Sequence, residues 1–107
     1  MSKSFVIVGK NGRNDVRAML VQGALKRKGY SAAHYHDISE LLGAFCDHES
    51  MNGKPFDVVI LVGCNLENGN KGIGKLLSAN YPDIKILFLS KETTIEGFLN
   101  QEVVNVQ

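Results

Sequence analysis

The sequence predicts an α/β fold in which helices cover both faces of a parallel β-sheet. Three apolar runs carry no polar alternation, which is typical of strands buried on both faces. These runs are Phe5–Val8, Val58–Val62 and Ile86–Leu89. The segments between them have helical periodicity, and strands that alternate with helices indicate parallel pairing. With 107 residues, 44% of them hydrophobic and 21% charged, the chain fits a single globular domain over residues 1–107.

The first helix follows the first strand after a polar loop. Apolar or small residues recur there at intervals of three and four, and we expect this stripe to face the sheet. The stripe consists of Val16, Met19, Leu20, Gly23 and Ala24. Asn14 or Asp15 can cap the start of the helix, and Gly29 can end it after a basic last turn.

The sequence in the middle of the chain predicts an edge strand and two more helices. Residues 31–36 form a weaker, edge-type strand, and Asp37 can cap the helix that follows. The apolar stripe of that helix consists of Ile38, Leu41, Leu42 and Phe45. Ile73, Leu76 and Leu77 mark a third helix, which stops before Pro82.

The sequence at the end of the chain predicts a short fourth helix and a fifth strand. The helix spans residues 93–99 with Ile95, Phe98 and Leu99 facing inward, and the strand spans residues 103–106. Since crossovers between parallel strands are right-handed, the expected strand order is 2-1-3-4-5. This is the three-layer, flavodoxin-like arrangement, here without a last helix.

Charge and composition exclude several function classes. The net charge of +1 gives no long-range field for a polyanion, so we expect no direct nucleic-acid binding. The basic cluster at residues 26–28 complements the negative end of a helix dipole. No apolar run has the length of a membrane span or of a signal-peptide core, and Cys46 and Cys64 lack metal-type spacing. We therefore expect a cytoplasmic protein that does not contact a membrane.

Catalytic and metal-binding patterns are weak. His34 and His36 share one face of the edge strand, but Cys46 and His48 lie two residues apart on a helix and cannot face the same way. A solvent-facing edge strand explains the histidines. No Ser-His-Asp, Cys-His or paired-carboxylate arrangement stands out, so we expect no enzymatic activity, no metal and no cofactor.

Three local patterns resemble the response-regulator receiver family, over nearly the whole chain up to Lys91. The first is the apolar strand at residues 5–8 followed by a helix containing Arg17 and by the exit Lys28-Gly29-Tyr30. The second is the third strand with its approach, residues 55–61. The third is the Tyr-Pro-Asp turn that leads into a strand ending in a hydroxyl residue, residues 81–90.

The resemblance implies a phosphorylation pocket that has lost its acidic residues. Receivers phosphorylate an aspartate at the end of the third strand and hold magnesium with two acidic residues after the first strand. Here Val62 stands at the phosphoacceptor position, Gly9 and Lys10 stand at the acidic pair, and only Ser90 matches the switch hydroxyl. The chain thus resembles a pseudo-receiver that cannot be phosphorylated, in which Lys10 is either a solvated loop residue or a replacement for the missing cation.

The resemblance also implies a protein partner. In the family the first and last helices cover the same face of the sheet. Because we expect the last helix to be missing here, we also expect an uncovered apolar patch near Phe5, Ile7, Val103 and Val104. Another protein or a second copy would cover it, unless the chain is a fragment of a larger regulator. Receivers contact partners through the fourth helix and fifth strand, here Ile95, Phe98, Leu99, Val103 and Val104. The expected function is protein interaction or dimerisation in signal transduction or transcription regulation.

An alternative function uses the glycine-containing loops after the first and third strands. Gly9–Gly12 and Gly63–Gly74 lie where open α/β sheets bind ligands, and a small molecule or nucleotide is the alternative partner. Residues 69–75 have the glycine and lysine spacing of a phosphate loop, but Leu76 replaces the hydroxyl that would bind magnesium.

Overall fold

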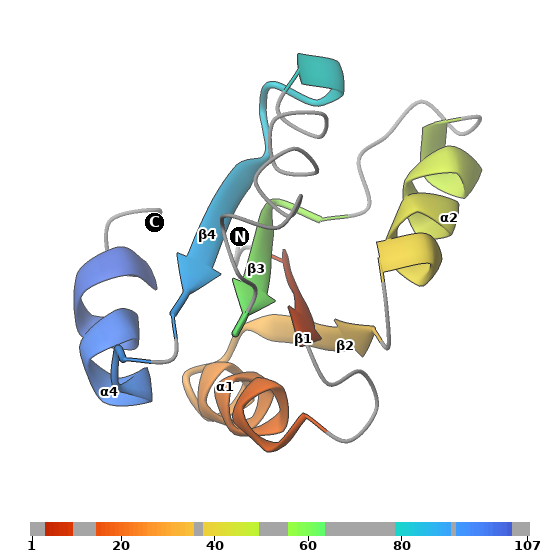
Figure 1. Cartoon of the computed structure of the whole chain (residues 1–107). Coiled ribbons are helices and arrows are strands. Elements are labelled where there is room, and N and C mark those ends of the chain that lie inside the picture. The colour runs from red at the N-terminus through yellow and green to blue at the C-terminus, as the bar shows by residue number, and fades with distance from the viewer. Residues whose placement is uncertain are drawn as a thin grey trace.

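A four-stranded parallel sheet forms the centre of the chain (Figure 1). The computed structural model describes residues 4–9, 15–35, 38–49, 56–63, 79–90 and 92–103, apart from the side chains of residues 38 and 45–49. The strands are β1 (Ser4–Gly9), β2 (Ser31–Tyr35), β3 (Val58–Val62) and β4 (Lys85–Leu89). The helical segments are α1 (Val16–Arg27), α2 (Ile38–Glu49), α4 (Ile95–Phe98) and a π-helical turn, η2 (Leu99–Val103), that continues α4.

The strand order is β2-β1-β3-β4, which confirms the first four places of the predicted order. The central strands are in register, with Phe5 opposite Val58 and Gly9 opposite Val62. Val62 in turn lies opposite Leu89 of β4. Every residue of β3, and every residue of β1 after Ser4, is buried. The apolar runs thus belong to strands that need a helical layer on each face.

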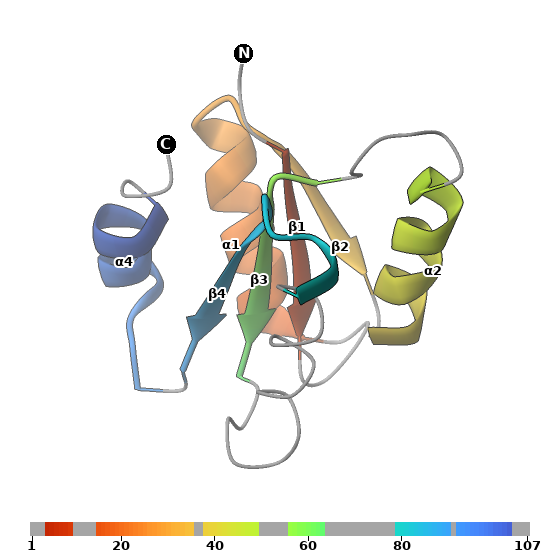
Figure 2. The same cartoon turned by 90° about the horizontal axis from the view of Figure 1, so that it is seen from above.

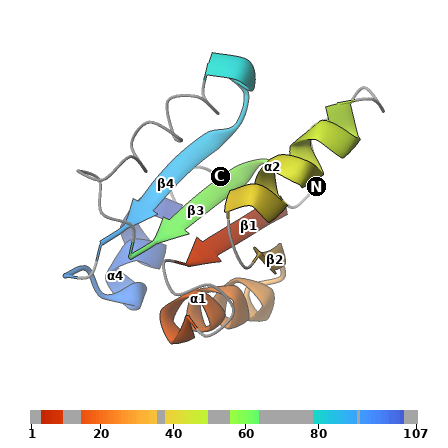
Figure 3. The same cartoon turned by 45° about the vertical axis from the view of Figure 1, so that its right-hand side comes forward.

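Helices α1 and α2 lie on opposite faces of this sheet, so the chain has three layers (Figure 3). On one face, the odd-numbered side chains of β1 and the even-numbered side chains of β3 join α1, α4 and η2 in what we call the α1-side cluster. On the other face, Leu41 of α2 packs with Val6, Val8, Val59 and Leu61. Within the described residues, the fold is of the α/β class and compatible with the flavodoxin-like arrangement.

Both ends of α1 follow from the local sequence as predicted. The Asp15 side chain accepts a hydrogen bond from the Ala18 backbone N–H at 2.9 Å, which caps the first turn. At the other end Gly29 adopts φ +91°, a left-handed conformation that glycine takes without steric cost. The Tyr30 and Gly29 N–H groups then bond back to the carbonyls of Leu25 and Lys26, at 3.1 and 3.0 Å.

The face that α1 turns toward the sheet differs from the predicted one. The buried residues of α1 are Ala18, Val21, Ala24 and Leu25, so only Ala24 of the predicted stripe is buried. Val16, Met19 and Leu20 point away from the sheet and are exposed. The prediction was wrong because α1 carries two apolar stripes of helical period, and the stripe with two alanines allows the closer approach to the sheet.

The end of the chain also differs from the prediction. The predicted helix is present, with Thr94 as its N-cap, but it continues through η2 to Val103, where a fifth strand was expected to begin. A π-type turn brings residues five apart to the same side, and Phe98 and Val103 are each only 1% exposed. Burial of Val103 beside α1 therefore overrides its preference for a strand. Residues 104–106, the rest of that predicted strand, lie outside the described residues.

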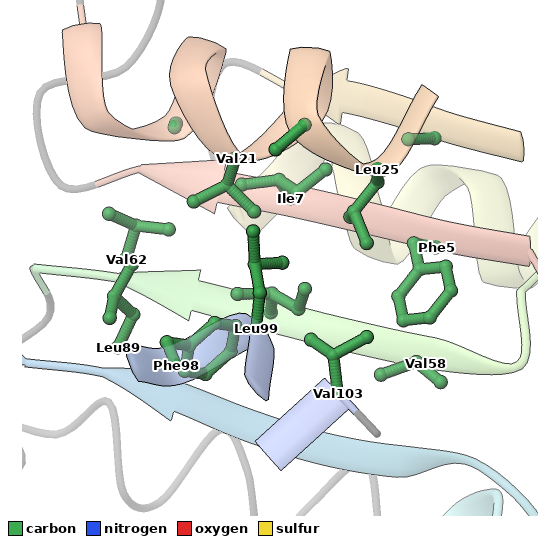
Figure 4. Packing of buried hydrophobic residues seen from close by; sticks show 14 residues of the cluster. Phe5, Ile7, Val21, Leu25, Val58, Val62, Leu89, Phe98, Leu99 and Val103 are labelled. Carbon is green, nitrogen blue, oxygen red and sulfur yellow. The ribbon is translucent and has the colours of Figure 1, made fainter. Parts of the chain in front are cut away.

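Because α4 and η2 pack beside α1, the face that was expected to be uncovered is covered (Figure 2). Phe5 and Ile7 are both fully buried. Figure 4 shows Phe98, Leu99 and Val103 on the same side of the sheet as Val21 and Leu25 of α1. The expected apolar patch near the start of β1 is thus absent from the described part of the chain.

The remaining predicted elements are described only in part. Residues 79 and 80 are helical and Tyr81 is not, so the third helix does end before Pro82. Its predicted apolar residues, Ile73, Leu76 and Leu77, lie outside the described residues, as do His36 and Asp37.

Replacement of Phe98 tests whether the C-terminal helical segment completes the core. Phe98→Ala is expected to lower the free energy of unfolding by about 3–5 kcal/mol, because it removes a fully buried ring. Glu102→Ala, at an exposed position of the same segment, is the control and is expected to change it by less than about 0.5 kcal/mol. Urea denaturation measures both. Equal stability of the two variants would contradict the packing of α4 and η2.

Candidate functional site

The carboxyl edge of the sheet is the first candidate site, because open parallel sheets bind ligands there. The structure brings three of the four predicted pocket residues to this edge: Gly9 ends β1, Val62 ends β3, and Ser90 directly follows β4. Gly9 and Val62 are paired in register. The fourth residue, Lys10, lies outside the described residues.

Val62 is a core residue. Its side chain is 1% exposed and belongs to the α1-side cluster, where Figure 4 shows it above Leu89. The Gly63 N–H donates to the Leu89 carbonyl at 2.8 Å, and Gly63 has φ +67°, a left-handed conformation that ends the strand after Val62. A methyl-bearing side chain held in this way can neither attack phosphorus nor ligate a cation.

Asp15 is a buried carboxylate at this edge that the sequence predicted only as a helix cap. Its side chain lies directly over Gly9, where an added Cβ would come within 2.5 Å of the Asp15 carboxyl carbon. Gly9 is therefore required by the close approach of Asp15. Asp15 is 4% exposed, and one of its oxygens already accepts the Ala18 N–H. The glycine that suggested a ligand cradle has a structural explanation.

Arg17 joins α1 to the loop after β4, a contact that sequence reasoning missed. Its Nη1 donates to the Ser90 carbonyl at 2.8 Å, and its Nη2 donates to the Thr93 carbonyl. The hydroxyls of the same two loop residues are hydrogen-bonded to each other at 2.9 Å. The Ser90 hydroxyl, expected as a switch group, is thus hydrogen-bonded within the loop after β4. The Arg17 guanidinium holds that loop against α1.

A signal for this contact was present in the sequence. Arg17 lies in the first turn of α1, next to the positive end of the helix dipole, where a cation is unfavourable. A cation retained at such a position indicates an acceptor from elsewhere in the fold. Here the acceptors are two backbone carbonyls more than 70 residues further along the chain, and no local pattern identifies them.

The described part of the carboxyl edge brings no set of magnesium ligands together. Magnesium prefers several carboxylate oxygens and water in octahedral geometry. Within residues 4–9, 15–35, 38–44, 56–63, 79–90 and 92–103, no group of three or more His, Cys, Asp or Glu side chains could hold a metal. His34 lies in β2, whereas His36 and the side chains of Cys46 and His48 are not described. The alternative glycine loops, residues 10–12 and 64–74, also lie outside the described part.

The outer surface of α1 is the second candidate site. Val16, Met19 and Leu20 are 62%, 44% and 52% exposed, and they form what we call the outer stripe. Their spacing of three and four residues places them on one side of the helix. A helix that is apolar on two sides normally has both sides covered. The outer stripe is therefore an exposed apolar surface of the kind that marks a contact.

An open groove between α1 and α4, which we call the α1/α4 groove, adjoins the outer stripe and shares Leu20 with it. The groove has a volume of about 450 Å³, with an apolar floor and charged residues along its rim. Its lining residues are Leu20, Ala24, Arg27, Lys28, Ile95, Glu96, Leu99 and Asn100.

The residues predicted to contact a partner are mostly buried. Phe98 and Val103 are each 1% exposed and Leu99 is 7% exposed, because all three belong to the α1-side cluster. Phe98 and Val103 cannot form a partner surface while α4 and η2 are packed, so this prediction is wrong for them, whereas Leu99 also lines the α1/α4 groove. Ile95 is half-buried and lines the α1/α4 groove. Val104 lies outside the described residues.

Comparisons of the chain with protein-family models, with curated proteins and with solved structures found no match. The resemblance to receivers therefore rests on the sequence patterns. Within the described residues, no helix has the length and apolar character that crossing a membrane requires.

Replacement of Gly9 tests the close approach of Asp15. Gly9→Ala is expected to lower the free energy of unfolding by about 1–3 kcal/mol, since the added methyl group would overlap the Asp15 carboxyl group. Gly43→Ala is the matched control, because a Cβ at Gly43 meets nothing within 4 Å. Gly43 is exposed and lies in the middle of α2, so that change should raise the free energy of unfolding by about 1 kcal/mol. Thermal or urea denaturation measures both variants. A Gly9→Ala variant that is more stable than the original chain would contradict the placement of Asp15.

Proposed function

We propose that this chain is a receiver-like signalling domain of the cytoplasm that acts by binding protein and carries out no aspartyl phosphorylation. The strand order β2-β1-β3-β4 supports the receiver-like part of the proposal. So does the Tyr-Pro-Asp turn before β4, with Ser90 directly after the strand. The binding role would be in signal transduction or transcription regulation.

One observation carries the proposal: the strand ends that face each other at the carboxyl edge, Gly9 and Val62, offer no carboxylate. Phosphoryl transfer to a side chain needs a nucleophile, and a receiver-type pocket needs acidic oxygens for magnesium. Val62 is apolar and buried, and Gly9 has no side chain. Asp15, the nearby carboxylate, is the cap of α1.

The hydrogen bonds around Ser90 support the proposal that the loop after β4 has one fixed conformation. A switch hydroxyl must be able to move toward a phosphoryl group when that group is added. Here the Ser90 hydroxyl is bonded to Thr93, and Arg17 holds the carbonyls of both residues. This arrangement favours one conformation of the β4–α4 loop without any modification.

The outer stripe supports the binding role. It lies on the outer, exposed side of α1, whereas Gly9 and Val62 are in the sheet, so a partner could bind there irrespective of phosphorylation. It replaces part of the surface predicted on α4, where Phe98 is buried in the core.

Titration with magnesium and beryllofluoride, followed by amide NMR, tests the proposal. Beryllofluoride with magnesium binds an intact receiver pocket as a mimic of the phosphoryl group. We expect no saturable shift of the Gly9, Val62 and Ser90 signals, because Gly9 and Val62 carry no carboxylate and Asp15 is engaged as the cap of α1. Magnesium chloride alone and sodium fluoride alone serve as controls for salt effects.

Saturable shifts at those three residues that need both magnesium and beryllofluoride would contradict the proposal. A separate titration with a nucleotide tests the alternative. Saturable shifts at Gly63 with the nucleotide alone would favour a nucleotide-binding domain over a protein-binding one.

A further inference from the structure

The outer stripe and the α1/α4 groove together form one continuous surface. Leu20 belongs to both, and the floor of the groove continues the apolar character through Ala24, Ile95 and Leu99. All three residues of the stripe stay exposed although the chain has a well-filled core. A continuous exposed apolar surface of this kind needs an occupant.

The helices on either side of the groove run in the same direction. Helix α1 follows β1 and α4 follows β4, so both begin at the carboxyl edge of the parallel sheet. Figure 4 shows Phe98 beside Leu89 near the ends of the strands, and Val103 beside Val58 near their starts. The surface therefore has one end at the carboxyl edge and the other end at the amino edge of the sheet.

The two ends of the groove lining carry opposite charges. Lys26, Arg27 and Lys28 are all exposed at the end of α1, near the amino edge. Glu92 and Glu96 are exposed at the start of α4, near the carboxyl edge. Arg27, Lys28 and Glu96 also line the groove. Among the charged residues that line the groove, the basic ones come from the end of α1 and the acidic one from the start of α4.

This charge pattern is complementary to itself when one copy is turned around. A two-fold axis through the surface would place the basic end of each copy against the acidic end of the other, with the apolar parts in contact between them. Two-fold interfaces are isologous, so each favourable pair of ends forms twice. A net charge of +1 opposes such association only weakly.

We infer that a second copy of this chain docks on the outer stripe and the α1/α4 groove, with the two α1 helices antiparallel. The inference rests on the proposed protein-binding function and names the partner. The apolar residues provide the contact area. The charged ends fix the antiparallel orientation, because the parallel one would bring like charges together.

Sedimentation equilibrium of the full chain from micromolar to millimolar concentration tests the inference. The mass is expected to rise from 11.7 kDa toward twice that value as concentration increases. Leu20→Glu should raise the dissociation constant more than about tenfold, because it puts a charge into the apolar contact. Ser39→Glu, which adds the same charge at an exposed position of α2, should leave it unchanged. Circular dichroism checks that each variant is folded.

Charge reversal tests the orientation. Arg27→Glu and Glu96→Lys are each expected to raise the dissociation constant about tenfold, since each creates two repulsive pairs in the dimer. The double variant should associate like the original chain, because the pairs are restored with their signs exchanged. Higher salt should weaken the original dimer.

Three results would overturn the inference: a monomer at every concentration, a dimer that Leu20→Glu does not weaken, or a double variant that stays as weak as the single ones. A monomer indicates that a different protein occupies the surface. The beryllofluoride titration separates this failure from failure of the proposed function. A monomer with unshifted Gly9 and Val62 signals rejects only the second copy, whereas a dimer with shifted signals rejects only the inert pocket.

Discussion

Burial of strands β1 and β3 on both faces is the constraint on which the rest of the structure depends. Such strands are stable only if each face of the sheet has its own layer of helices. Helix α1 alone cannot cover one face of a four-stranded sheet, and α4 with η2 supplies the remaining cover. The C-terminal segment is therefore helical to Val103, and Phe98 and Val103 are used in the core.

The same packing accounts for both candidate sites. At the carboxyl edge, α1 approaches so closely that Asp15 leaves room only for glycine at position 9. Arg17 then connects α1 with the loop that leads into α4. On the outside, the parallel placement of α1 and α4 creates the groove that extends the outer stripe. The tight contact over Gly9 and the exposed apolar surface thus have a common origin in how the two helices cover the sheet.

The sequence predicted those features that depend on local patterns. The strands follow from continuous apolar runs, and the ends of α1 follow from a capping aspartate and a glycine after a basic turn. The inward face of α1 could not be predicted, because both of its stripes have helical period and only tertiary packing chooses between them. The valine-rich end of the chain indicated a strand, but Val103 is needed in the core. The Arg17 contact joins segments too distant in sequence for any local signal to reveal its acceptors.

The position of Val103 tests the central claim most directly, because the claim requires the end of the chain to pack as a helix beside α1. Nuclear Overhauser contacts of the Val103 methyl groups measure it. The account predicts contacts with side chains of the α1-side cluster, such as those of Val58 and Leu25, together with helical contacts along residues 95–103. Strand-type contacts of Val103 with the backbone of β4, and none with the cluster, would contradict it.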